Sequence, residues 1–200
     1  MNEARRRPGG GKLMAHPFLR QIQNALWPPG QPGYYKVWAV LDGARDQRIY
    51  GAVVGTSLNN CCLYSGDLPS DTKLTAPYLI ELDRDDRFTH YIINKGWGNS
   101  WGIFFRSPER MEKLRRHLRG FLVVKDEQGR RLVFRYYDPR VLRVYLPTCF
   151  ARELQTVFGP IDRFLVEGED PATLIRFDFD GTSMSQETIE LQTTSNVSQK

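Results

Sequence analysis

The stretch FRYYDPRVLRVYLP, at Phe134–Pro147, joins a strand pattern to a helix pattern. The segment 130–137 is predicted to form a strand, in which successive side chains point to opposite faces. Arg135 then shares a face with Tyr137, on a strand whose other residues are largely apolar. Because a polar group on a buried face requires a partner, we expect Arg135 to find one elsewhere in the chain.

The residues after this strand carry the signals of a helix start and a helix end. Asp138 is a candidate N-cap, and Pro139 follows at the first helical position, where the missing N–H of proline costs nothing. Pro147 is expected to end the helix. Arg140 and Arg143 would remain accessible on it. The sequence therefore predicts a strand that turns directly into a short helix, with charged groups at the junction.

Strand and helix patterns alternate on both sides of this stretch. Strands are predicted at 34–41, 61–64, 78–82, 101–106, 121–125, 130–137, 161–166 and 173–179, and further helices at 46–56, 86–95, 107–120 and 150–158. The 34–41 run is mostly apolar, which favours burial on both faces, and strands alternating with helices favour parallel pairs. We therefore expect an α/β (α+β) fold, a single compact domain whose central mixed β-sheet has about six to seven strands flanked by helices.

Chain length and composition suit one domain. The 200 residues are 40% hydrophobic and 12% aromatic, which is enough to bury a core. Residues 1–33 are expected to form a flexible leader with a short helix near 18–26 and a Pro/Gly linker, PPGQPG, at 28–33. The α/β domain is expected over 34–180. Polar residues dominate 181–200, so we expect a disordered tail there.

The net charge of +5 is concentrated near the N-terminus, because Met1–Lys12 holds four basic residues and one acidic residue. A body so mildly basic argues against nucleic acid as a partner. No apolar run is long enough for a signal peptide or a membrane span, so no membrane partner is expected. Cys61, Cys62 and Cys149 form no disulfide framework, which is typical of a reducing compartment. These features together predict a cytoplasmic protein.

NSWG at Asn99–Gly102 looks like the asparagine block of papain-like proteases, and Cys62, His90 and Asn99 follow in the matching order. The spacing argues against a protease, since 28 residues separate Cys62 from His90, where those enzymes have roughly 130 to 150. We interpret Gly96, Gly98 and Gly102 as permitting a tight turn. Trp97 and Trp101 would then pack within the domain. The histidines share no metal-like spacing with the cysteines, and no phosphate-binding glycine loop occurs, so no metal, cofactor or small-molecule substrate is expected.

Asp42, Asp138 and Arg140 allow two interpretations. Loops after strand ends are where α/β proteins place their sites, so these residues could form the acid/base cleft of a small hydrolase. In the structural interpretation, Asp42 binds loop N–H groups, Asp138 caps its helix for about 1 kcal/mol, and Arg135 or Arg140 pairs with one of the acids. We favour the structural interpretation, because no nucleophile with an adjacent base is visible. Weak nucleic-acid binding through the basic residues is a third alternative.

Six blocks of the chain together resemble one protein family. They are, in chain order, LDGARDQRIY at Leu41–Tyr50, CLYSGDLP at Cys62–Pro69, APYLIELD at Ala76–Asp83, GWGNSWGIF at Gly96–Phe104, the stretch at Phe134–Pro147, and FGPIDRFLVEGED at Phe158–Asp170. This ordered, collinear set is similar to the effector-adaptor (effector-chaperone) family of bacterial type VI secretion systems. Six separated blocks in the right order are more specific than any one motif among them.

The resemblance implies a non-enzymatic adaptor. Such adaptors bind a toxic effector in the bacterial cytosol and load it onto the spike protein at the tip of the injection apparatus, so the expected partners are an effector and a spike protein. Trp, Tyr and Arg commonly anchor such interfaces, and the motif residues of these types chosen as candidate anchors are Trp97, Trp101, Tyr137 and Arg140. Structural roles are expected for Asp42, Gly43, Arg45, Gly66, Gly96, Gly102, Arg135, Asp138, Pro139 and Pro147.

Many members of that family carry a further, mainly helical lobe after the α/β part. This chain has its polar tail in that place. We therefore expect either a minimal adaptor or a lobe that another protein supplies.

Overall fold

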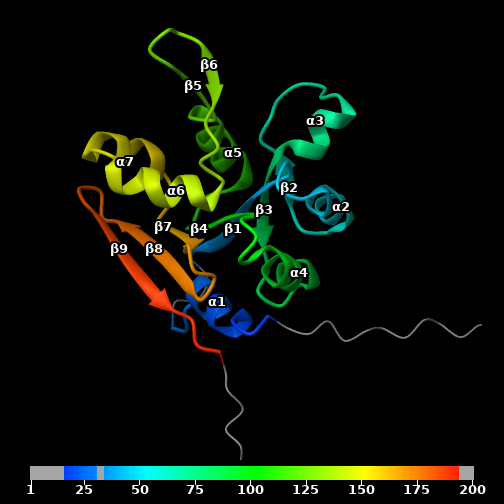
Figure 1. Cartoon of the computed structure of the whole chain (residues 1–200), viewed down its shortest axis with the longest axis vertical. Helices are drawn as coiled ribbons and strands as arrows, with labels where there is room; N and C mark the ends of the chain where they lie inside the picture. The colour runs from blue at the N-terminus through cyan, green and yellow to red at the C-terminus, as the bar shows by residue number, and fades with distance from the viewer. Residues whose placement is uncertain (1–15, 31–33, 194–200) are drawn as a thin grey trace, which may run out of the picture.

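The computed structural model describes residues 16–30 and 34–193, and within these ranges seven strands form one antiparallel sheet (Figure 1). Across the sheet the strands are β2 (Asn60–Cys62), β3 (Pro77–Leu82), β1 (Lys36–Asp42), β4 (Gly102–Ser107), β7 (Arg163–Glu167), β8 (Thr173–Phe179) and β9 (Met184–Glu190). A separate hairpin consists of β5 (Val123–Lys125) and β6 (Arg131–Val133). With the helices that flank them, these strands make the mixed α/β domain that the sequence predicts.

The helices lie between and beside these strands. They are α1 (Leu19–Leu26), α2 (Gln47–Gly55), α3 (Ser70–Thr75), α4 (Arg87–Gly96), α5 (Met111–Gly120), α6 (Pro139–Tyr145) and α7 (Ala151–Phe158), with a 3-10 turn at Leu146–Thr148. In the described ranges, none of them has the length and apolar character needed to cross a lipid bilayer. The short helix α3 is not predicted by any pattern in the sequence.

The prediction of parallel neighbours is wrong, and the chain path explains why. Strands β1 and β2 are joined through α2 and run in the same direction, but β3 lies between them and pairs antiparallel with both. In the same way, β3 and β4 are joined through α4 and have β1 between them. A helix between two strands therefore indicates a shared direction without making the strands neighbours.

Helices cover both faces of the sheet (Figure 1). One apolar cluster packs α1, α2 and α4 on the first face, and a second cluster packs α5, α6 and α7 on the opposite face. Strand β1 lies between the two clusters, with Ala39 in the first and Trp38 in the second. This alternation confirms that β1 is buried on both faces.

The helix starts predicted at residues 46, 86 and 138 are confirmed, and the start predicted at residue 107 is displaced. The side chains of Asp86 and Asp138 each accept a hydrogen bond from the N–H two residues further on, at 2.7 and 3.0 Å. Helix α5 begins at Met111 and not at Ser107, because Ser107 still belongs to β4 and donates its hydroxyl to the Pro160 carbonyl at 2.7 Å. Helix α7 follows Phe150, whose backbone N–H donates to the Glu153 carboxylate at 2.8 Å, and this agrees with the helix predicted at 150–158.

The strand predicted over 130–137 is shorter than expected, since β6 ends at Val133. Tyr136 and Tyr137, which were expected within this strand, are both buried. They lie instead in the turn that leads into α6, while Leu132 and Val133 are exposed. The tertiary contacts of the two tyrosines therefore override the local strand pattern.

The sheet continues beyond residue 180, so a disordered tail from 181 onward is wrong for much of that segment. Strand β9 pairs with β8 along its whole length, and Leu191 packs into the first apolar cluster. Residues 194–200, residues 1–15 of the predicted leader and residues 31–33 of the predicted linker lie outside the described residues. Helix α1 packs into the same cluster through Ile22 and Leu26, so it is part of the domain.

Replacing Gly102 with alanine should destabilise the sheet. A Cβ at this position would lie 2.1 Å from the carbonyl oxygen of Val40 on the neighbouring strand β1. Because packed backbone does not move aside easily, we expect Gly102→Ala to lower the free energy of unfolding by about 1–3 kcal/mol, measured by urea denaturation. Gly120→Ala is the control, because a Cβ there meets no atom within 4 Å. Equal stability of the two variants would contradict this account of Gly102.

Candidate functional site

The organising feature of the site is an ion pair between Asp42 at the end of β1 and Arg135 before α6. The Asp42 side chain is 0% exposed and accepts hydrogen bonds from the Ala44 N–H at 3.1 Å and from the Arg135 guanidinium. Arg135 is partly exposed, and the hydrogen bond from its guanidinium to Asp42 raises its pKa. This contact supplies the polar partner that the sequence requires for Arg135.

A second pair holds the start of α6. Arg140 donates to the carboxylate of Asp138 through Nε at 2.9 Å and through Nη2 at 2.6 Å, and its backbone N–H donates to the same carboxylate at 3.0 Å. Burial raises the pKa of Asp138, but hydrogen bonds from Arg140 outweigh this effect and hold the pKa below its usual value. Asp138 is thus both a helix cap and the anion of an ion pair.

A third buried acid, Glu167 at the end of β7, organises the loop between α4 and β4. Its carboxylate accepts hydrogen bonds from the backbone N–H groups of Gly98 at 2.7 Å and Ser100 at 2.9 Å, and from the Ser100 hydroxyl at 3.0 Å. Burial raises the pKa of Glu167 despite these donors. Gly98 and Ser100 both have positive φ, at 78° and 55°, so the loop holds a conformation that side chains rarely adopt.

We call Asp42, Arg135, Asp138, Arg140 and Glu167 the polar junction. Sequence reasoning identified the first four and assigned no role to Glu167. The acid lies in the last of the quoted sequence blocks, but nothing in its local pattern indicates that it binds the N–H groups of a loop nearly 70 residues earlier. The junction therefore joins the ends of β1 and β7, the start of α6 and the α4–β4 loop.

The remaining motif residues shape the backbone around the junction. Gly43, Gly96 and Gly102 each stand where a Cβ would come within 3.0 Å of a neighbouring atom, whereas Gly66 has open space and a φ of 87°. Arg45 donates to the Asn99 carbonyl at 3.1 Å. Pro139 is buried at the first position of α6, and Pro147 lies in the 3-10 turn that follows it.

Three of the four candidate anchors lie inside the protein. The side chains of Trp97, Trp101 and Tyr137 are between 2% and 4% exposed, and the indole N–H of Trp97 donates to the Pro171 carbonyl at 2.8 Å. These residues cannot contact a partner while the domain is folded, so their assignment as surface anchors is wrong. Arg140 is exposed, although its guanidinium is engaged by Asp138.

The residues considered for a hydrolase, a protease or a metal site do not have the surroundings that such sites require. Asp42 and Asp138 are both buried, and each is paired with an arginine. Burial raises the pKa of Cys62, which is opposite to what a thiolate nucleophile requires. Among residues 16–30 and 34–193, no three His, Cys, Asp or Glu side chains gather in a way that could hold a metal ion.

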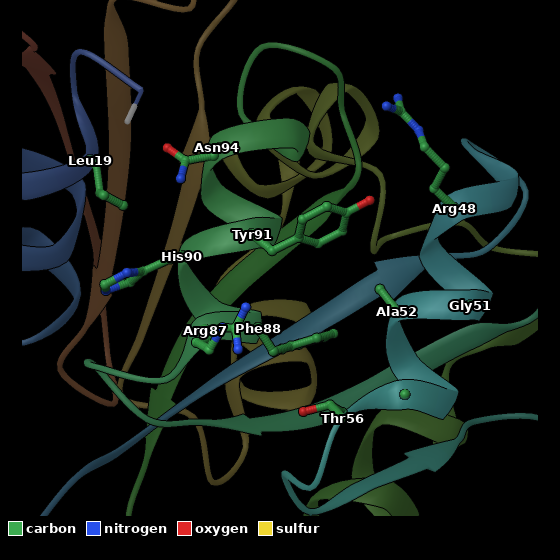
Figure 2. A pocket seen from close by; sticks show the side chains of 11 residues that line it. Leu19, Arg48, Gly51, Ala52, Thr56, Arg87, Phe88, His90, Tyr91 and Asn94 are labelled. Carbon is green, nitrogen blue, oxygen red and sulfur yellow. The ribbon is translucent and has the colours of Figure 1, made fainter. Parts of the chain in front are cut away.

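A groove of about 830 Å³ lies between α2 and α4, on the sheet face that α1 also covers (Figure 2). Figure 2 shows Phe88 and Tyr91 reaching from α4 toward the small residues of α2. Arg48 and Arg87 lie at its rim, and Arg48 also stacks over Trp101, 5.3 Å from the ring centre. Leu19, Gly51, Ala52, Gly55, Thr56, His90 and Asn94 complete the lining.

The β5–β6 hairpin projects from the α5 side of the domain (Figure 1). Its four apolar strand residues, Val123, Val124, Leu132 and Val133, are between 39% and 51% exposed. A lone two-stranded hairpin is marginally stable in water, and exposed apolar side chains grouped in one place mark interaction surfaces more often than single ones do. The hairpin is therefore a second candidate binding surface.

Removing Arg135 should destabilise the domain by leaving the Asp42 charge buried without its partner. Loss of one partner of a buried pair typically costs about 3–5 kcal/mol, and because Arg135 is partly exposed we expect about 3 kcal/mol for Arg135→Met. The double variant Asp42→Asn/Arg135→Met should recover part of this loss, because the charge is gone. Urea unfolding of the single and double variants measures this coupling, and strictly additive losses would contradict the pairing.

The stability of the domain should depend on pH through Glu167. Its pKa in the folded state is raised from the usual 4.5, so the folded protein binds this proton more tightly than the unfolded chain does. The contribution of Glu167 to the free energy of unfolding is therefore largest below pH 4.5 and declines as the pH rises through the raised value. Relative to Glu167→Gln, the wild type should lose stability as the pH rises above 4.5, measured by urea unfolding. A difference that is constant, or that grows with pH, would show that the carboxylate is not penalised by burial.

Comparison with protein-family models finds one match, described as "Domain of unknown function (DUF4123)", over residues 37–156. Comparisons with curated proteins and with solved structures find no match. The matched range begins in β1 and ends in α7, and it contains Asp42, Arg135, Asp138 and Arg140, while Glu167 lies beyond it. Because the match spans more than half of the chain, this protein belongs to the DUF4123 family.

Proposed function

We propose that this protein is a non-enzymatic adaptor of a bacterial type VI secretion system, which binds a toxic effector in the cytoplasm and loads it onto the spike protein. The resemblance of the six sequence blocks to effector adaptors suggests this function, and membership of the DUF4123 family is compatible with it.

The contacts of the polar junction support a binding role for the protein over a catalytic one. Asp42 and Asp138 are each neutralised by an arginine, and Glu167 is surrounded by backbone donors. Groups held in this way orient helices and loops, and their hydrogen-bonding capacity is largely used within the protein. We therefore assign the polar junction the task of holding the domain in shape for binding.

The observation that carries the proposal is the presence of two candidate binding surfaces on opposite faces of the sheet. The groove lies between α2 and α4, which pack on the first face. The hairpin leads out of the second cluster, which contains Leu122 and contacts Phe134. A protein that hands one partner to another must hold both at once, and surfaces separated by the sheet allow this without steric conflict.

Co-purification tests the proposal. The full chain, tagged at its C-terminus, is expressed with the spike and effector candidates encoded beside its gene, singly and together. We expect each candidate to be retained alone and both to be retained in one complex, detected by size-exclusion chromatography. Retention of neither candidate by folded protein would overturn the adaptor function.

A variant that fills the groove makes this test specific to a surface. Ala52 lines the groove, so Ala52→Trp should displace one candidate and leave the other bound. Ala151→Trp is the matched control, because Ala151 is exposed at the start of α7, among the helices of the opposite face. Loss of the same candidate in both variants would show that the groove is not the surface responsible.

A further inference from the structure

The two faces of the β5–β6 hairpin carry different kinds of side chain. Strand alternation puts Val124 and Leu132 on one face together with Leu122 and Phe134, which pack into the second apolar cluster. The other face carries Val123, Lys125, Arg131 and Val133, which we call the basic hairpin face. All four of these residues are exposed. The first face thus continues the core outward, whereas the basic hairpin face turns away from it.

The basic hairpin face carries two positive charges that lie directly opposite each other. Lys125 and Arg131 are direct cross-strand partners, and neither forms an ion pair with any residue that the structure describes. Like charges directly opposite each other destabilise a strand pair. The nearby acid Asp126 is already engaged by Arg130 at 2.7 Å. The free hairpin therefore carries an electrostatic cost that a bound anion would relieve.

The apolar half of the same face restricts what the bound group can be. Val123 and Val133 are also direct partners, so a pair of aliphatic side chains lies next to the pair of cations. The complement of this surface offers carboxylates beside apolar side chains. Aliphatic residues provide no ring on which a nucleic-acid base could stack, and Trp, Phe or Leu are the residues that usually enter a lipid surface. A protein segment fits best.

We propose that the basic hairpin face binds an acidic segment with apolar side chains in one of the two protein partners; this rests on the proposed function and names the surface and the partner chemistry for one side of it. Cross-interface charge pairs would form at Lys125 and Arg131, and the partner would bury Val123 and Val133. Binding through such pairs weakens with added salt.

Charge reversal tests the ionic half of the proposal in the same co-purification with the spike and effector candidates. In Lys125→Glu/Arg131→Glu, two like charges still face each other, so the stability of the hairpin is matched to that of the wild type. We expect retention of one candidate to fall about tenfold or more, and retention of the other to stay unchanged. The control Arg20→Glu/Arg152→Glu makes the same change in net charge at exposed positions in the first turns of α1 and α7, where acids are favourable, and should retain both.

A second variant tests the apolar half. Val123→Thr/Val133→Thr preserves the β-branched shape that strands favour and replaces one methyl group of each side chain with a polar hydroxyl. It should weaken retention of the same candidate that the charge reversal affects. Circular dichroism and thermal unfolding of each variant confirm that the fold is intact.

The outcomes separate the inference from the function on which it rests. If the wild type retains neither candidate, the adaptor function fails. If the wild type retains both and the two hairpin variants behave like the wild type, the adaptor function stands and the docking surface is wrong. Binding of the wild type to phosphatidylglycerol vesicles or to single-stranded DNA, lost in the charge-reversed variant while both candidates remain bound, would assign the face to a membrane or to nucleic acid and would also overturn the proposal.

Discussion

The buried carboxylate of Asp42 is the constraint on which the rest of the structure depends. It lies at the end of the central strand β1, where no solvent reaches it, so its charge must be balanced within the protein. The balancing guanidinium belongs to Arg135, 93 residues further along the chain. This one contact ties the middle of the sheet to the segment that begins α6. Asp138, three residues later, then caps that helix and fixes its direction relative to the sheet.

Further hydrogen bonds stabilise the end of the sheet at which Asp42 lies. The N–H of Asp42 donates to the Trp101 carbonyl at 2.8 Å, and Glu167 at the end of β7 binds the loop that precedes Trp101. Strand ends, a helix start and a glycine-rich loop are thereby fixed together by hydrogen bonds to carboxylates, which are stronger than those between neutral groups. The motif residues at this end of the sheet stabilise the fold. They are widely spaced in the sequence because several separate segments of the chain meet there.

The two candidate binding surfaces lie apart from the polar junction. The groove between α2 and α4 and the hairpin β5–β6 stand on opposite sides of the sheet, and neither is lined by a residue of the polar junction. The hairpin in particular belongs to none of the six quoted blocks and makes its own two-stranded sheet. Its side chains can change to suit a partner without disturbing the buried charges. This separation between the supporting and the contacting residues suits an adaptor, which needs a rigid body and adjustable surfaces.

The sequence by itself determined the features that depend on near neighbours in the chain. The caps at Asp86 and Asp138, the burial of β1 on both faces, and the need of Arg135 for a polar partner all follow from local pattern and chemistry. Only the tertiary structure decided that the partner is Asp42, that all neighbouring strands of the large sheet are antiparallel, and that β9 forms from a polar segment beside β8. It also decided that three of the four aromatic and arginine anchors expected from the motifs are buried, and that the fourth, Arg140, is already paired with Asp138. Strand order, burial and ion pairing arise from contacts between distant segments, and a pattern read over a few residues contains no information about which distant segment will supply the contact.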